Sequence, residues 1–381
     1  MSMPGGSATA RGEQRAEGSA GGAAVGESLP LDQWRGFALL LVLVSHGFYF
    51  TGRVSGIGRV GVNLFFFISG LLVYRSLVRS SAPDFTGRAI GFWKSRIRRL
   101  YPALLGYLIL GIPLTFLLQD IPTAAPDGRL ADYLHTLPRA MAYGMNFAAA
   151  PVPAALHHLW SLSTEVQFYL LGPLIFWAGG TALSRRRWVW GTLLGVLMAI
   201  GMAQPRFGEL VKYYFQFSVW PMMLGFVAEA ARPQFETFCR VVAKPALVLS
   251  VFALLLSMGL MMLGTKAKVV VIAIGAAMIF PCYCAYVAGI AIEGPFGRLL
   301  TWLGSRTYSI YLWQQPFTLC GYLPPVMHPV GAILACGVGA VSFRWLEAPF
   351  MRRRGGRAVG AAGVGAKTAT AEREIPAAAG R

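Results

Sequence analysis

Long apolar runs separated by short polar connections fill the chain between residues 31 and 352. A helix crosses a bilayer with about 20 predominantly apolar residues. The runs that approach this length lie near residues 36–52, 60–78, 100–118, 157–179, 188–203, 213–230, 243–264, 268–290, 307–323 and 327–347. The fifth run is short, and only a few residues around Lys266 separate the seventh from the eighth. The pattern predicts an all-α, polytopic integral membrane protein with about ten transmembrane helices.

The two ends of the chain lack this pattern. Residues 1–30 and 353–381 are rich in glycine and alanine and show no apolar periodicity, so we expect both to be disordered tails. No layout typical of a signal peptide precedes the first apolar run. The sequence therefore predicts one transmembrane domain over residues 31–352.

Composition agrees with a membrane protein and argues against bound metal. Of 381 residues, 55% are hydrophobic and only 13% are charged, which is far from the average of a soluble domain. The 5 cysteines have no spacing that suits a zinc site or a disulfide framework, so we interpret them as packing residues. We predict no metal site and no tightly bound cofactor.

The net charge of +18 has two explanations, a nucleic-acid partner or an anionic membrane face. The distribution of the basic residues favours the membrane, because lysine and arginine near helix ends are retained on the cytoplasmic side. With ten spans, that side receives Arg75, Arg79, Arg88, Lys94, Arg96, Arg98, Arg99, Arg185, Arg186, Arg187, Arg232, Arg240, Lys244, Arg298, Arg306, Arg352, Arg353 and Arg354. We therefore expect both termini in the cytoplasm, a multi-pass location in the cell (inner) membrane, and no nucleic-acid partner.

A histidine inside the first apolar run is the first candidate for chemistry. His46 follows Arg35 by 11 residues, and an ionisable side chain within a bilayer is costly enough to indicate function. The alternative is a histidine that only forms a hydrogen bond inside the helix bundle. The depth at which other polar residues lie must decide between them.

A cluster of arginines precedes the third run. Arg96, Arg98 and Arg99 lie just before Pro102, at the predicted cytoplasmic mouth. The planar guanidinium binds phosphate through several donors, so the cluster suits a phosphorylated ligand. A contact with lipid phosphates is the simpler alternative.

The fourth run opens with polar residues at helical spacing. Ser161, Glu165 and Tyr169 are four residues apart and share one helical face, and Trp160 lies beside them. A carboxylate inside a span rarely lacks a partner. An interfacial aromatic belt would explain Trp160 and Tyr169 but not Glu165.

Two further segments carry polar residues into apolar runs. Asn63 opens the second run, and we interpret Ser69 and Gly70 near its middle as small residues that permit close helix packing. Near the end of the chain, Glu347 lies close to Arg344 and Arg352, and we expect it to form a structural ion pair there.

Taken in order, these motifs resemble the membrane acyltransferase-3 family, over roughly residues 30–352. The matching residues are Arg35 with His46, Arg96 with Arg99, and the run from Trp160 through Ser161 and Glu165 to Tyr169. Members of this family acylate sugars of O-antigen, Nod factors and exopolysaccharides, and in some actinomycetes macrolides. Asn63 stands where the family commonly has aspartate, and Gln314 where it often has histidine. The chain shows no appended hydrolase-like domain, so we expect the membrane domain to complete the transfer, alone or with a separate partner.

The resemblance implies an O-acyltransferase that uses acyl-CoA, with acetyl-CoA the expected co-substrate, and a glycan or glycoconjugate of the cell envelope as acceptor. Arg35, Arg96 and Arg99 would bind the donor phosphates. His46 would be the general base, because a buried imidazole stays neutral and can accept a proton.

The remaining site residues would serve His46 or the acceptor. Glu165, which we expect at a depth similar to that of His46, would orient the imidazole or hold the acceptor. Trp160 would stack on a sugar face, with Ser161, Tyr169 and Asn63 shaping the site. Eleven helical residues separate Arg35 from His46 by about 16 Å, which is comparable to the reach of a pantetheine arm.

Three alternatives stay open at this point. The acyl group passes directly to the acceptor or rests on the protein first. The acceptor is a glycan, or it is a lipid or secondary metabolite such as a macrolide. Finally, ten spans with a buried histidine and glutamate also suit a proton-coupled transporter.

Overall fold

The structure is a computed structural model that describes residues 29–48, 57–120, 129–147, 152–179, 191, 193–197, 199–200, 215–262, 267–319 and 323–352. These residues are largely helical, and no strand occurs among them. The all-α prediction is therefore confirmed for this part of the chain. The predicted tails lie outside the described residues, except that residues 29 and 30 already belong to the first helix.

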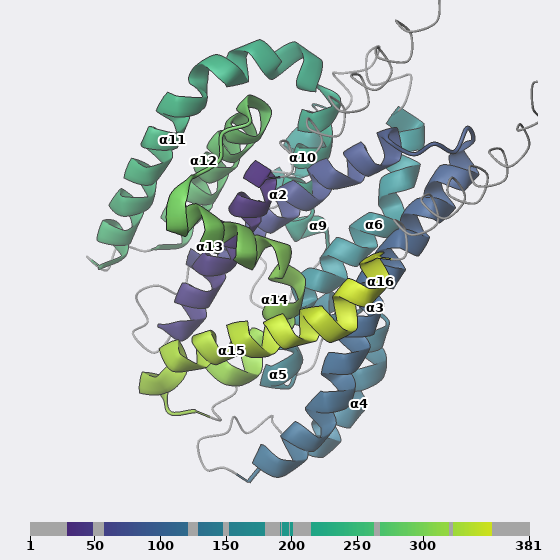
Figure 1. The fold of residues 1–381 in the computed structure, drawn as a ribbon, viewed down its shortest axis with the longest axis vertical. Coiled ribbons are helices and arrows are strands. Elements are labelled where there is room, and N and C mark those ends of the chain that lie inside the picture. Colours follow the sequence, from purple (N-terminus) through teal and green to yellow (C-terminus); the bar gives the residue numbers. More distant parts are fainter. Residues whose placement is uncertain are drawn as a thin grey trace, which may run out of the picture.

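Figure 1 shows the order of the elements. After a first helix at residues 29–47 come α2 (Ile57–Val78), α3 (Phe85–Leu118), α4 (Leu130–Met141), η2 (Met145–Phe147), α5 (Ala154–His157) and α6 (Leu159–Gly179). The second half contains α9 (Phe215–Ser218), α10 (Trp220–Ala230), α11 (Arg232–Met262), α12 (Ala267–Ala288), α13 (Gly294–Ser305), α14 (Thr307–Thr318), η4 (Pro325–Met327), α15 (His328–Ser342), the π-helical turn η5 (Phe343–Glu347) and α16 (Ala348–Arg352).

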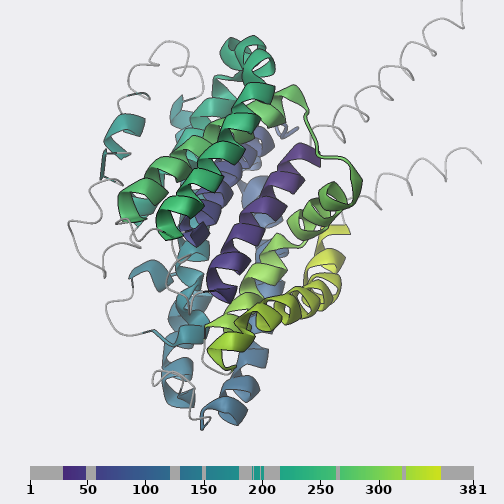
Figure 2. The same ribbon diagram turned by 90° about the vertical axis from the view of Figure 1, so that its left-hand side faces the viewer.

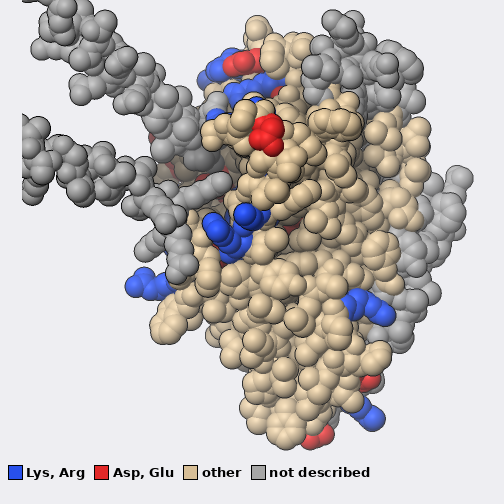
Figure 3. All heavy atoms as spheres, turned by 90° about the vertical axis from the view of Figure 1, so that its right-hand side faces the viewer, with Lys and Arg blue, Asp and Glu red and all other residues tan. Residues whose placement is uncertain are grey.

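Among the residues that the structure describes, four helical segments are long and apolar enough to cross a membrane: Ile57–Val78, Phe85–Leu118, Arg232–Leu256 and Pro325–Met351. The protein is thus a multi-pass membrane protein. In Figure 3, wide parts of one face carry no charged side chain, as a lipid-facing surface requires. The count of ten spans and the side of each terminus stay predictions, and most of the run at 188–203 lies outside the described residues.

Glycines let α2 and α10 touch through their backbones. A Cβ at Gly70 would lie 1.9 Å from the Met222 carbonyl oxygen, and a Cβ at Gly225 would lie 2.0 Å from the Phe67 carbonyl oxygen. Only a residue without a side chain fits such a crossing. The packing role predicted for Gly70 is confirmed.

The first helix runs antiparallel to α2. A Cβ at Gly58 would lie 2.9 Å from Ser45 Oγ, whereas one at Gly61 would lie 2.4 Å from the Ala38 carbonyl oxygen. Moving forward along α2 therefore means moving back along the first helix, toward Arg35. Figure 2 shows this first helix, in purple, crossing the middle of the molecule. The pairing fixes the level of each polar residue in the site.

Candidate active site

The three predicted donor-binding arginines come together at one end of the first helix. Asp84 caps α3 through its side chain, and the helix then delivers Arg96 and Arg99 one turn apart. They join Arg35 around a cavity of about 330 Å³, here called the arginine vestibule, whose lining is Leu31, Asp32, Arg35, Leu72, Arg75, Ser76, Arg79, Arg96 and Arg99. Its lining holds five arginines and one aspartate, and Glu229 and Glu347 beside it pair with Arg75 and Arg99, which leaves an excess of positive charge. The ligand of the vestibule stays a prediction.

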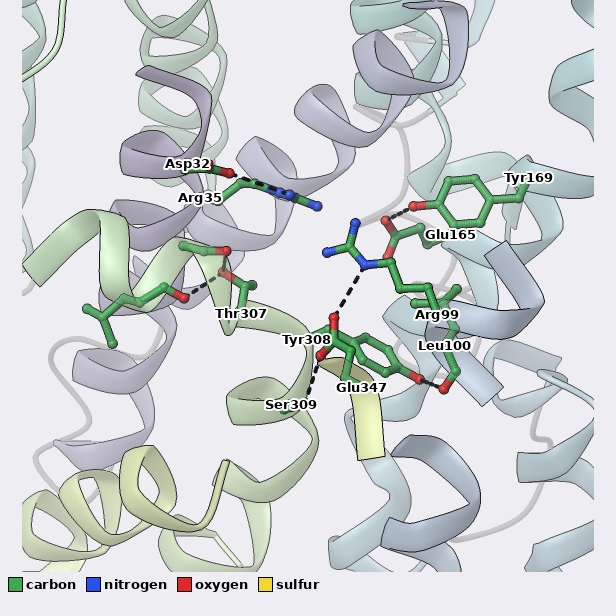
Figure 4. Close-up of polar contacts among 12 residues, drawn as sticks. Asp32, Arg35, Arg99, Leu100, Glu165, Tyr169, Thr307, Tyr308, Ser309 and Glu347 are labelled. Carbon is green, nitrogen blue, oxygen red and sulfur yellow. Dashed lines mark hydrogen bonds and ion pairs between the residues drawn. The ribbon is translucent and has the colours of Figure 1, made fainter. Parts of the chain in front are cut away.

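Each of the three arginines is held by a neighbour. Asp32 Oδ1 lies 3.9 Å from Arg35 Nη1, and Glu347 Oε1 lies 3.3 Å from Arg99 Nε. The guanidinium of Arg96 stacks over Tyr169, 4.9 Å from the ring centre. Burial raises the pKa of Asp32 above its usual range, although the positive charges of Arg35 and Arg99 oppose that shift. In Figure 4, Arg35 and Arg99 extend toward each other from opposite sides.

A smaller inner cavity continues from the vestibule. Its volume is about 50 Å³, which is room for a few water molecules. Arg35, Arg96 and Arg99 line both spaces. The rest of the inner lining comprises Val62, Phe65, Phe66, Ser69, Leu100, Ser161, Leu162, Glu165, Tyr169, Thr307, Tyr308 and Tyr311. A charged mouth thus leads to a chamber of hydroxyls, aromatic rings and one carboxylate.

Glu165 is the centre of the inner cavity's hydrogen bonds. The hydroxyls of Ser69 and Tyr169 both donate to Glu165 Oε1. Glu165, Tyr169 and Ser161 line the same cavity, so the shared helical face predicted for them is confirmed. The interpretation of Ser69 as a packing residue alone was wrong. Its spacing from Val62, Phe65 and Phe66 places it on one face of α2, but the sequence gives no sign that this face lines a cavity.

His46 lies apart from Glu165. Its Nδ1 is 2.5 Å from Gln314 Oε1 on α14, and His46 is absent from the lining of the inner cavity. Ser69 follows Gly61 by eight residues, or about 12 Å along α2, toward Arg35. Glu165, bound to Ser69, therefore lies at the level of Arg35 and not at that of His46, and the expectation of a similar depth was wrong.

Gln314 defines the tautomer of His46. The Gln314 amide nitrogen donates to Gln315 Oε1 at 3.3 Å, so its Oε1 faces the imidazole as an acceptor. Nδ1 then carries the hydrogen and Nε2 keeps its lone pair, as a general base requires. The amide that replaces the family's usual histidine is thus the partner of the predicted base.

Two residues of the inner cavity lining, Ser161 and Tyr311, form a further hydrogen-bonded group. The hydroxyl oxygens of Ser161 and Tyr311 lie 2.7 Å apart, and the Ser161 hydroxyl donates to the His158 carbonyl oxygen at 3.1 Å. Tyr311 precedes Gln314 by one helical turn on α14. Nothing in the sequence singles out Tyr311 as a site residue, because only its contact with Ser161 of α6 places it there.

Besides His46, two predicted residues lie outside the inner cavity lining. Trp160 packs its ring edge-on against Phe66 with centres 6.2 Å apart, and the guanidinium of Arg59 lies 5.0 Å from its ring centre. Asn63 is buried on α2. Neither position contradicts the predicted acceptor-side roles, which stay predictions.

Comparison with known proteins places this architecture in a family. A family profile described as an acyltransferase domain (Acyl_transf_3) matches residues 30–343. The O-acetyltransferase OatA of Staphylococcus aureus (strain NCTC 8325 / PS 47) is 26% identical over 358 residues, which cover 86% of this chain and 58% of OatA. YrhL of Bacillus subtilis (strain 168), named "Putative peptidoglycan O-acetyltransferase YrhL", is 25% identical over 362 residues, which cover 84% of this chain and 54% of YrhL.

The chain therefore spans a little over half the length of these curated relatives. No solved structure gives a significant match. The profile covers Arg35, His46, both vestibule arginines of α3, and Glu165 in one continuous stretch. The chain belongs to the acyltransferase-3 family.

Proposed function

We propose that the protein transfers an acyl group, with acetyl the expected one, from cytoplasmic acyl-CoA to a hydroxyl of an extracytoplasmic glycan. The arginine vestibule carries this proposal. Five arginines converge on a cavity of about 330 Å³ that adjoins the inner cavity, and the first helix connects Arg35, which lines both, with His46. Because CoA carries its phosphates at one end and its thioester at the other, a positive mouth with chemistry further in suits it.

The donor would bind with its phosphates in the vestibule and its pantetheine arm in the inner cavity. The predicted span of about 16 Å from Arg35 to His46 matches such an arm. An inner cavity of about 50 Å³ is smaller than the arm, so donor binding requires the surrounding helices to separate. The ring of Tyr311, which packs edge-on to Phe65 with centres 6.3 Å apart, stands in this path.

His46 would act as the general base from the acceptor side. Its Nε2 takes the proton that the acceptor hydroxyl loses as the hydroxyl oxygen attacks the thioester carbonyl. The carbon–sulfur bond then breaks, and the departing CoA thiolate takes that proton from the imidazolium. Donation from Nδ1 to Gln314 stabilises the imidazolium between the two proton transfers.

The names of the relatives favour peptidoglycan as the acceptor to test first. Purified protein in lipid nanodiscs would receive radiolabelled acetyl-CoA together with purified peptidoglycan or a macrolide. Label in peptidoglycan is the expected result, and label in the macrolide alone would favour a secondary-metabolite acceptor. With the protein in sealed proteoliposomes instead, transport of unchanged substrate without label in either acceptor would favour a transporter.

The variant His46→Ala tests the assigned chemistry. Loss of a general base is expected to slow transfer by about 100-fold or more. Binding of acetyl-CoA to the purified variant should stay within about twofold of the wild type, because no vestibule residue changes. Normal turnover by a folded His46→Ala protein would refute the role.

A further inference from the structure

The last helical segment of the chain contains a break that places one carboxylate beside the vestibule. Between α15 and α16, residues Phe343–Glu347 form a π-helical turn, and the Ala348 amide bonds the Phe343 carbonyl across five residues. One extra residue in a turn rotates the subsequent residues by about 100° relative to a regular α-helix. Such turns are rare and recur at functional sites. Here the rotated residue is Glu347.

Glu347 is completely buried and has two partners from distant parts of the chain. Its Oε1 accepts from Arg99 Nε at 3.3 Å, and its Oε2 accepts from the Ser309 hydroxyl at 2.9 Å. The structural ion pair expected with Arg344 or Arg352 was therefore assigned to the wrong partner. Arg344 is exposed, and the side chain of Arg352 lies outside the described residues.

The surrounding helices hold this carboxylate firmly. A Cβ at Gly106 of α3 would lie 2.3 Å from Leu346, the residue before Glu347. Gly106 follows Arg99 by seven residues, so both lie on the face of α3 that meets the π-turn. The Tyr308 hydroxyl also donates to the Leu100 carbonyl oxygen at 2.8 Å, which ties α14 to α3 one residue beyond Arg99.

The bond from Nε fixes the direction of the Arg99 guanidinium. Glu347 occupies Nε, and Figure 4 shows the terminal nitrogens of Arg99 pointing toward Arg35. Two groups of like charge that face each other across a cavity repel unless an anion lies between them. Each of them has its own carboxylate behind it, Asp32 for Arg35 and Glu347 for Arg99.

We propose that Glu347 is a positioning residue that, with the π-turn, holds Arg99 opposite Arg35 so that the pair grips one phosphate of the donor. Loss of the carboxylate would free the guanidinium to turn away from Arg35. A carboxylate also offsets part of the positive charge of Arg99, so pure charge attraction predicts tighter donor binding after its removal. The positioning role requires the opposite result.

This inference rests on the proposed acyl-CoA site, and donor binding tests it without any acceptor. The full chain in nanodiscs would be titrated with acetyl-CoA and with S-acetylpantetheine, which has the same thioester arm but no phosphate. Glu347→Ala is expected to weaken acetyl-CoA binding about tenfold, the scale of one charge-assisted hydrogen bond. Binding of S-acetylpantetheine should not change.

Three further comparisons complete the experiment. Glu347→Gln keeps an acceptor for Arg99 Nε and should bind acetyl-CoA within about twofold of the wild type. In an Arg99→Ala background, Glu347→Ala should have no further effect on acetyl-CoA. Glu236→Ala, which removes the acid of an exposed pair with Arg240 on α11, is the matched control and should leave both ligands unaffected.

Three outcomes would overturn the inference. Glu347→Ala binds acetyl-CoA as tightly as the wild type or more tightly, it binds acetyl-CoA and S-acetylpantetheine more weakly by the same factor, or it weakens acetyl-CoA binding just as much in the Arg99→Ala background. Equal weakening would indicate general damage to the fold. If the wild type binds acetyl-CoA no better than S-acetylpantetheine, the proposed donor site itself fails. If instead the wild type prefers acetyl-CoA to S-acetylpantetheine and Glu347→Ala keeps the same preference, the donor site stands and only the role of Glu347 fails.

Discussion

Replacing Gln314 by leucine tests how the proposed base is held. Gln314 is completely buried, and its Oε1 is 2.5 Å from His46 Nδ1. Leucine fills a similar space but offers no acceptor. In the resting state the neutral imidazole of His46 would lose the hydrogen bond that its Nδ1 donates to Gln314, and during transfer the imidazolium would lose a stronger one.

The magnitude follows from the difference between these two bonds. A hydrogen bond between neutral groups contributes about 0.5–1.5 kcal/mol, and one to a charged group about 1.5–3 kcal/mol. Their difference is about 1–2 kcal/mol of transition-state stabilisation, so kcat should fall about 5- to 30-fold. The KM for acetyl-CoA should change little, because the vestibule lies about 16 Å away along the first helix.

The assay is steady-state transfer of radiolabel from acetyl-CoA to peptidoglycan, with the melting temperature of each protein as a test of folding. Gln33→Leu is the matched control, because it removes another buried amide, which bonds the Ile292 backbone and neither Gln314 nor His46. A folded Gln314→Leu protein with the kcat of the wild type, or one no slower than Gln33→Leu, would refute the assignment of the tautomer.

Three other variants probe the vestibule, the inner cavity and the helix packing. Arg96→Ala should raise the KM for acetyl-CoA about tenfold with little change in kcat, and a fall in kcat alone would contradict a role in ground-state binding. Ser69→Ala removes one of two hydroxyl donors to Glu165 and should slow transfer about tenfold; unchanged turnover would show that this bond is dispensable. Gly70→Ala should destabilise the protein by about 1–3 kcal/mol in thermal unfolding, because its Cβ would overlap the α10 backbone. Gly91→Ala, whose Cβ meets no atom within 4 Å, should be neutral or stabilising, and equal melting of the two variants would contradict the close crossing.

Local spacing in the sequence predicts part of this site well. Residues four apart on a helix share a face, and Ser161, Glu165 and Tyr169 do line one cavity. The arginines of the first helix and of α3 also meet, as the ordered motifs led us to expect. These relations lie within one helix or follow from the family resemblance.

Relations between helices could not be predicted in the same way. The level of Glu165 depends on the pairing of α2 with the first helix, which the contacts at Gly58 and Gly61 determine. Glu347 and Arg99 are 248 positions apart in sequence, and nothing near Glu347 distinguishes Arg99 from the closer Arg344. Hydropathy sets the number of apolar runs but carries no information about register between helices.

Polar residues also lower the mean hydropathy of α6 below that of the recognised spans. This helix has 21 residues, yet it is not among the four segments apolar enough to be recognised as spans. Ser161, Ser163, Thr164, Glu165 and Gln167 occupy its first half. Two of these five, Ser161 and Glu165, line the inner cavity, so the site itself contributes to the weaker apolar signal of the helix.

The small volume of the inner cavity limits how much acyl donor would be lost to hydrolysis. In the proposed reaction, water that met the thioester beside the general base would compete with the acceptor hydroxyl and consume donor without acylating an acceptor. A chamber of about 50 Å³ admits few waters, and a pantetheine arm that enters would displace them. Exclusion of water from the thioester would then make donor consumption depend on the arrival of an acceptor hydroxyl from the other side of the membrane.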